Sequence, residues 1–200
     1  MGTNGIRMQK ELSGESCYPL KDSPAPRKSV RVSQTFKKPL TTFDELMEAI
    51  SMYISRGSEK IRRHNNVAEA ITVYVMTNRF KSAAYYNSRT ATLRTPSRDT
   101  PELIKISRLL LKDIFQHGRY YTKAGIMFPS LARRDQTQRD LFDPIDRERS
   151  YELMKAMDSI NQRMGSYAAM GLSEHVPWKG ASNYRFPEYT TKWNQLLRVQ

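Results

Sequence analysis

Cysteine and histidine are both scarce in this chain of 200 residues. Cys17 is the one cysteine, and the three histidines, His64, His117 and His175, stand in different segments. A single cysteine excludes an intrachain disulfide and a zinc cluster built on thiolates. Because the histidines lack the short spacings of a metal site, we expect no bound metal and no cofactor.

Long hydrophobic runs are also missing. The chain has no stretch of about 18 apolar residues, the length that marks a candidate membrane-spanning helix. Its first residues, MGTNGIRMQK, lack the basic, apolar and small-residue pattern of a signal peptide. We therefore expect a cytoplasmic protein with no membrane partner.

The residue groups that carry catalysis are not assembled in the sequence. There is no glycine-rich phosphate loop, and Cys17 has no histidine in its own segment. Asp143 and Asp146 are the closest pair of carboxylates, but they lie in a stretch that nothing is expected to hold rigid. We predict that the chain by itself is not an enzyme and has no catalytic residue.

Acidic residues are too few to balance the basic ones. The chain has 33 lysines and arginines against 20 aspartates and glutamates, which gives a formal charge of +13. A surface this positive favours a polyanionic partner. Nucleic acid is the most common such partner, and an anionic membrane is the rival.

Four strands and two helices are predicted between residues 29 and 130. Alternating apolar residues predict the strands, which are expected at 29–36, 69–78, 88–95 and 121–128. One helix is expected at 41–64 and a second at 99–118. This order predicts an α+β fold of the ferredoxin-like split βαβ (β-α-β-β-α-β) type, with both helices on one face of the sheet.

The two helices carry recognisable start and stop signals. Thr42 and Glu45 form a capping box at the start of the first helix. Thr100 is the expected cap of the second helix, Pro101 stands in its first turn, and Gly118 is its expected end.

Composition divides the rest of the chain. Residues 1–28 hold a short helical stretch ending at Gly14 and a proline-containing linker. Residues 131–149 are charged, lack a period and are expected to form a tether. Residues 150–200 begin with a helix at 150–165 and continue as an irregular extension.

The uncovered face of the sheet is predicted to hold hydroxyls and cations with almost no carboxylates. Hydroxyls donate hydrogen bonds to phosphate oxygens, and Lys and Arg neutralise their charge. We interpret this face as a site for a nucleic-acid backbone, with an ordinary solvated face as the alternative. The candidate DNA-binding residues are Arg31, Ser33, Thr35, Ser88, Thr90, Thr92, Arg94 and Lys123.

Two segments outside the sheet also suggest binding. In the polar stretch QTQRDLFDP (136–144), Leu141 and Phe142 are two large apolar residues that suit a partner's pocket or a contact with their own domain. In the tail, Trp178 and Trp193 are among aromatic residues that alternate with basic ones. Such a mixture suits stacking on single strands and equally suits a tail packed on its own domain.

Six short strings carry a resemblance to a known family. They are RMQKELSGESC, VRVSQTF, LRTPSRDTPELI, HGRYYTKAGIMF, QRDLFD and FPEYTTKWNQLLRV, and together they extend over nearly the whole chain. In this order they resemble the C-terminal half of UmuC-type subunits, which belong to the Y-family of lesion-bypass DNA polymerases.

The resemblance implies a division into four parts. Residues 1–28 would be a remnant of the thumb with a linker, and 29–130 the little-finger domain, which grips primer–template duplex. Residues 131–149 would be a tether with a clamp-binding motif, and 150–200 the extension that UmuC-type subunits carry. The palm and fingers, with the metal-binding carboxylates of nucleotide transfer, have no counterpart in the chain.

The resemblance also implies partners. Gln138, Leu141 and Phe142 match the pattern by which polymerases bind the sliding clamp. The processed UmuD-type dimer and the RecA filament are further partners in the family.

The function implied is that of the DNA-binding and clamp-tethering portion of an SOS-induced, error-prone translesion polymerase that acts in DNA damage tolerance. Two alternatives stay open. The chain could be a protein-interaction fragment without significant DNA binding, or a half-enzyme completed by a separately encoded catalytic half.

Overall fold

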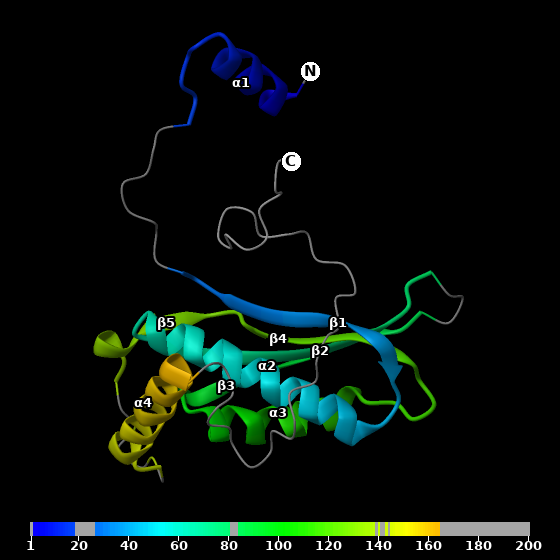
Figure 1. The fold of residues 1–200 in the computed structure, drawn as a ribbon, viewed down its shortest axis with the longest axis vertical. Helices are drawn as coiled ribbons and strands as arrows, with labels where there is room; N and C mark the ends of the chain where they lie inside the picture. The colour runs from blue at the N-terminus through cyan, green and yellow to red at the C-terminus, as the bar shows by residue number, and fades with distance from the viewer. Residues whose placement is uncertain are drawn as a thin grey trace, which may run out of the picture.

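A sheet covered on one face by two helices forms the centre of the computed structural model, which describes residues 2–18, 27–80, 84–138, 140, 143 and 145–164 (Figure 1). The predicted order of strands and helices is confirmed. The strands are β1 (Val30–Leu40), β2 (Asn66–Thr77), β3 (Tyr86–Ser97) and β4 (Tyr121–Phe128). The two helices are α2 (Phe43–Arg63) and α3 (Thr100–Ile114).

The strands lie side by side in the order β1-β4-β2-β3, and every neighbouring pair is antiparallel. It follows that β1 and β2 run parallel with β4 between them, and that β3 and β4 run parallel with β2 between them. Each strand–helix–strand unit is thus split by a strand of the other. This is the split βαβ arrangement that the sequence predicts.

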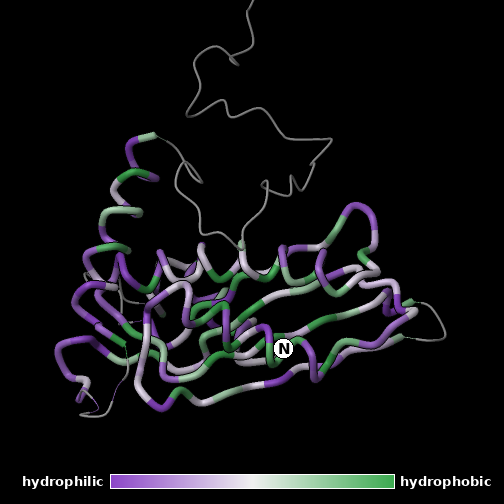
Figure 2. Tube along the Cα trace, turned by 90° about the horizontal axis from the view of Figure 1, so that it is seen from below, coloured by the Kyte–Doolittle hydropathy of each residue, from purple (hydrophilic) through white to green (hydrophobic). Residues whose placement is uncertain are grey.

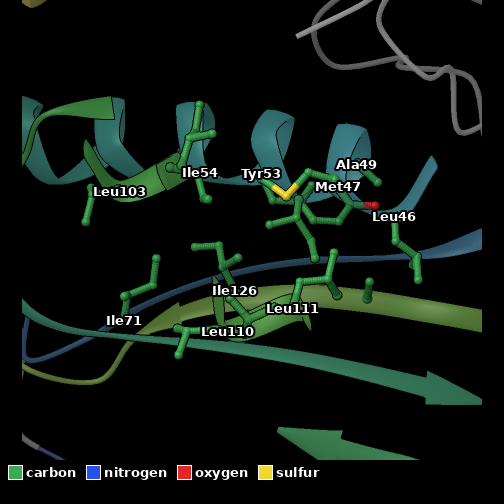
Figure 3. Close-up of a cluster of buried hydrophobic side chains, with 14 of the residues drawn as sticks. Leu46, Met47, Ala49, Tyr53, Ile54, Ile71, Leu103, Leu110, Leu111 and Ile126 are labelled. Atoms are coloured by element: carbon green, nitrogen blue, oxygen red, sulfur yellow. The ribbon is translucent and has the colours of Figure 1, made fainter. Parts of the chain in front are cut away.

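The core lies between the sheet and the two helices. Leu46, Ile50, Tyr53 and Ile54 of α2 are fully buried there, and the labelled side chains in Figure 3 show the same helix packed over the strands. In Figure 2 the helical turns alternate between hydrophilic and hydrophobic colours, as helices with one buried side require. Gly57 lets α2 approach the sheet closely, because a Cβ there would lie 2.9 Å from a ring carbon of Phe128.

The ends of the helices agree with the sequence in one case and differ in the other. The capping box of Thr42 and Glu45 is present at the start of α2. In α3, however, Asp99 occupies the cap position, so that Thr100 is the first helical residue. The helix also ends at Ile114, before Gly118, because Phe115 leaves it in an extended conformation and stacks on Tyr121 at 5.8 Å.

The segment after β4 is more ordered than the predicted tether. β5 (Leu131–Arg133) pairs with Asn66–Ala68 of β2 and so prolongs the sheet, and a 3₁₀ turn (Arg134–Gln136) follows. The charge of the segment and its lack of a period predicted a tether. Three of its residues instead pair with the backbone N–H and C=O groups at the edge of β2, which would otherwise lack partners in the sheet. A sequence period cannot be read over so short a strand.

Two further helices lie outside the sheet unit. α1 (Thr3–Leu12) has no buried residue and is followed by Gly14 at φ +89, which agrees with the predicted stop. α4 (Arg147–Met164) begins three residues earlier than the predicted helix and buries Met154, whereas Leu153, Ile160 and Met164 of its predicted apolar face are exposed. The aromatic and basic tail lies outside the described residues.

Candidate nucleic-acid interface

The face of the sheet opposite the helices carries all eight predicted DNA-binding residues. Strand register places the outward side chains in rows that cross from β1 to β3. The rows are Arg31–Met127–Thr72–Thr90, Ser33–Gly125–Tyr74–Ser88 and Thr35–Lys123–Met76–Tyr86, and Thr92 and Arg94 follow further along β3. We call this surface the uncovered face.

Polar side chains on the uncovered face form two lines along the outer strands. On β1 the residues Arg31, Ser33 and Thr35 are exposed. On β3 the exposed line consists of Ser88, Thr90, Thr92 and Arg94. Lys123 of β4 lies between the lines and is half-buried. The lines therefore offer hydroxyls along their length and a cation near one end of each.

The middle of the uncovered face is less polar than the sequence suggested. Tyr74 is 4% exposed, and Met76 and Met127 are half-buried beside it. The predicted site residues include none of Tyr74, Met76 and Met127. Their outward position follows from the same alternation of the strands that places Thr72 and Lys123 on this face.

Arg31 is held in place by Tyr74. Its Nε donates a hydrogen bond of 2.9 Å to the Tyr74 hydroxyl, and its guanidinium lies 4.6 Å from the centre of the Tyr74 ring. The ring occupies the space above Gly125, where a Cβ would lie 2.5 Å from the hydroxyl oxygen. Arg31 is therefore positioned before any ligand arrives, which lowers the ordering cost of binding an anion.

Arg94 has a carboxylate partner that the sequence did not indicate. Its Nε lies 3.0 Å from Asp140, which belongs to the segment that carries the predicted clamp-binding residues. The Arg94 side chain is nevertheless 80% exposed, so that solvent screens the pair and a phosphate could replace Asp140.

The predicted clamp-binding residues are only partly within the described chain. Gln138 is exposed. Leu141 and Phe142 lie outside the described residues.

The segment on both sides of these residues is fixed to the domain by ion pairs. Arg147 of α4 contacts Glu102 at 2.5 Å and Asp143 at 2.6 Å, and all three side chains are at most 20% exposed. The hydrogen bond from Arg147 holds the pKa of Asp143 below its usual value. Further along α4, Asp158 accepts two hydrogen bonds of 2.7 Å from Arg62 of α2.

The α4 contact also includes an aromatic ring between cations. The guanidinium groups of Arg98 and Arg134 lie 4.5 and 4.3 Å from the centre of the Tyr151 ring. Burial, and then the nearby Arg134, lower the pKa of Arg98. Both arginines thus contact the ring, and they help fix α4 beside the sheet unit.

Metal clusters and membrane-spanning helices are both absent from the part of the chain that the structure describes. Within it, no three His, Cys, Asp or Glu side chains come together as a metal site would require. Every helix within it is too short or too polar to cross a bilayer.

Comparison with known proteins decides the family. Residues 27–141 match the model of the impB/mucB/samB family C-terminal domain. The chain belongs to this family. Residues 151–199, which begin within α4, match a domain of unknown function, DUF4113.

Individual relatives agree with this family. The chain is similar to Protein UmuC of Salmonella typhimurium strain LT2, with 31% identity over 97% of this chain and 47% of that protein. It is 32% identical to Protein SamB of Salmonella typhimurium and 26% identical to Protein MucB of Escherichia coli, in each case over 95% of this chain and 46% of the relative. The chain thus spans about half the length of these curated relatives, and the predicted resemblance to UmuC-type subunits is confirmed.

A solved structure, the insertion ternary complex of Dbh DNA polymerase, is also similar. The TM-score is 0.44 with 13% identity, over 66% of this chain and 36% of that one.

Proposed function

We propose that the impB/mucB/samB family domain of this chain binds the backbone of duplex DNA through its uncovered face, as part of a cytoplasmic lesion-bypass polymerase. The relatives include Protein UmuC, and the resemblance to UmuC-type subunits connects this function with error-prone synthesis across DNA damage. The charge of +13 favours a polyanionic partner.

The observation that carries the proposal is the pair of polar lines on β1 and β3. These strands are separated by β4 and β2, so the lines lie three strand spacings, or about 14 Å, apart. The major groove of DNA is about 12 Å wide. Two lines of hydroxyls and cations at that separation suit the two phosphate backbones that border the groove.

Anisotropy of a labelled primer–template duplex, measured over a series of salt concentrations, tests this function. Arg31→Ala and Lys123→Ala should each weaken binding and lower the slope of log affinity against log salt by about 0.9 per lost phosphate contact. Lys105→Ala is the matched control, because Lys105 is exposed on α3, which covers the other face. Salt-independent binding, or equal losses in the variants and the control, would contradict the proposal.

We further propose that Gln138, Leu141 and Phe142 bind a sliding clamp. Burial of two large apolar side chains contributes about 1.5–3 kcal/mol each, which after ordering costs suits a complex of about micromolar affinity. In a pull-down with the clamp, Leu141→Ala/Phe142→Ala should lose binding. Leu153→Ala, which truncates an exposed apolar residue of α4, should not.

The same two assays separate the main alternative. If the chain were a protein-interaction fragment, it would bind the clamp while its affinity for duplex remained negligible. The processed UmuD-type dimer and the RecA filament, partners of the family, can be tested in the same pull-down.

We propose that the chain alone does not transfer nucleotides. A primer-extension assay with Mg²⁺ and all four deoxynucleotides should give no product from this chain. Extension that appears only when a separate palm-containing half is added would instead support a half-enzyme.

A further inference from the structure

Three chain connections meet at one end of the sheet, on the right in Figure 1. Leu40 at the end of β1 and Thr77 at the end of β2 both pair with Tyr121, the first residue of β4. Tyr86, the first residue of β3, pairs with Met76. Residues 37–39, 78–80, 84–86 and 117–120 therefore lie together, and we call them the loop end.

The loop end exposes aromatic rings. Phe80 is 83% exposed, Tyr120 is 68% exposed and Tyr86 is 61% exposed. Among the residues that the structure describes, Tyr18, next to the linker, is the other large aromatic side chain that is exposed. The exposed leucines and isoleucines lie elsewhere, on α1, α3 and α4. The large hydrophobic side chains that are exposed at the loop end are thus all aromatic.

A groove runs between these connections. Its volume is about 300 Å³, and Pro39, Asn78, Arg119 and Tyr120 are among the residues that line it. This volume lies at the lower end of the range of small-molecule sites, about 300–1,000 Å³. The groove is large enough for a group of the size of a nucleotide base, but not for a folded segment.

Charge at the loop end has one sign. The described connections 36–42, 77–80, 84–86 and 115–121 contain Lys37, Lys38, Arg79 and Arg119 but no aspartate or glutamate.

The nearest carboxylates along the chain are Asp44, Glu45 and Asp113. Glu45 accepts the capping hydrogen bonds of Thr42, and Asp113 lies 3.7 Å from Arg89. Arg79 lies 5.0 Å from the centre of the Phe80 ring, so that a cation lies beside an exposed ring.

We propose that the loop end binds single-stranded DNA by stacking unpaired bases on Phe80, Tyr86 and Tyr120. Single strands combine exposed base faces with phosphates, and proteins that bind them combine exposed aromatic rings with a cationic groove. A bilayer or a partner protein would be expected to find exposed aliphatic side chains as well, and these lie on other elements. Bases stacked inside a duplex have no free face to place against the rings, and this requirement for unpaired bases distinguishes the site from the uncovered face.

The position of the loop end favours DNA as the source of the strand. Tyr86 and Lys123 belong to the last cross-strand row of the uncovered face. A strand that leaves a duplex on that face would therefore meet the loop end next. The choice of DNA rests on the proposed function of the uncovered face, whereas the preference for a single strand does not.

Anisotropy with the full chain tests this site. The probes are a labelled oligothymidylate of about 12 nucleotides, within the known site sizes, and a blunt duplex. Phe80→Leu/Tyr120→Leu keeps apolar bulk but removes both rings. It should lower the affinity for the oligothymidylate about tenfold or more, while the affinity for the blunt duplex stays within twofold. Tyr120→Trp alone should retain binding.

Matched variants identify the cause of any loss. Tyr18→Leu removes an exposed ring elsewhere and should leave both affinities unchanged. Arg79→Ala should lower the salt slope for the single strand by about 0.7, whereas the ring variants should lower affinity without changing the slope.

Three outcomes would overturn the inference. They are an unchanged affinity of the ring variant for the oligothymidylate, an equal loss for the blunt duplex, and loss of binding to anionic phospholipid vesicles with unchanged oligonucleotide affinity. A failure of the proposal that the uncovered face binds duplex would give a different result, because Arg31→Ala would then leave the duplex affinity unchanged.

Discussion

At the residue scale, Gly125 is the position where the smallest change should have a large effect. A Cβ at this position would meet Ser33 and Tyr74 at 2.5 Å. We expect Gly125→Ala to displace the Tyr74 ring and to lower the free energy of unfolding by about 1–3 kcal/mol, as overpacking commonly does. Urea unfolding measures this change.

Tyr74→Phe separates positioning from packing. It keeps the ring above Gly125 but removes the hydroxyl that accepts from Arg31. We expect the duplex affinity to fall by about two- to tenfold, because the released Arg31 side chain must then be ordered on binding at a cost of about 0.5–1.5 kcal/mol. The free energy of unfolding should fall by no more than the about 0.5–1.5 kcal/mol of one hydrogen bond. An affinity equal to that of the parent chain would show that Arg31 does not depend on Tyr74.

A buried hydroxyl gives a prediction of opposite sign. Tyr53 is fully buried, and its hydroxyl has no hydrogen-bond partner among the residues that the structure describes. Burial also raises the pKa of Tyr53. Since an unpaired buried hydroxyl costs about 1–3 kcal/mol, Tyr53→Phe should leave the melting temperature unchanged or raise it. A clear fall in calorimetry would indicate a partner such as an internal water.

At the scale of elements, Arg147 is one of the side chains that hold α4 against the sheet unit, beside the Arg62–Asp158 pair and the Tyr151 ring. Arg147 joins α4 to Glu102 of α3 and to Asp143. Its replacement by Ala leaves two largely buried carboxylates without their cation and should weaken the docking by about 1–3 kcal/mol. Amide hydrogen exchange along α4 should accelerate accordingly. Arg149→Ala is the control, because Arg149 is exposed on the same helix.

Acid should release the same contact. The pKa of Asp143 is held below its usual value by the hydrogen bond from Arg147, so the folded state prefers its ionised form. This contribution to stability is complete above the unfolded pKa of about 3.9 and is lost as the pH falls through the lowered folded pKa. Thermal unfolding between pH 6 and 2 should be less acid-sensitive in Asp143→Asn, and identical profiles would contradict the assignment.

The elements themselves could be predicted because each carries a local signal. The alternation of β1, the capping box of α2 and the one-sided helices are visible in any short window. β5 and the early end of α3 could not be predicted from a local signal. β5 exists through its pairing with Asn66–Ala68, and α3 ends early because Phe115 stacks on Tyr121. The same limit holds for the site: alternation assigns Arg31 to the uncovered face, but only the fold brings it to Tyr74.

At the scale of the whole molecule, the two surfaces of the proposed function share an ion pair. Arg94 belongs to the β3 line of the uncovered face, and its partner Asp140 belongs to the segment of the clamp-binding residues. A DNA phosphate at Arg94 must compete with Asp140. Because linkage is reciprocal, DNA binding should release this segment to the same extent that the segment weakens DNA binding.

The size of this coupling can be bounded and measured. An exposed ion pair contributes about 0–1 kcal/mol, so Asp140→Asn should raise the duplex affinity by at most about fivefold. Asp135→Asn removes the same charge from the same segment, but Asp135 is paired with Arg133, which lies outside the two lines. A rise confined to Asp140→Asn, and abolished in Arg94→Ala/Asp140→Asn, assigns the coupling to this pair. An equal rise of duplex affinity in both single variants would instead attribute the effect to net charge, since a long-range field acts on the duplex from either position.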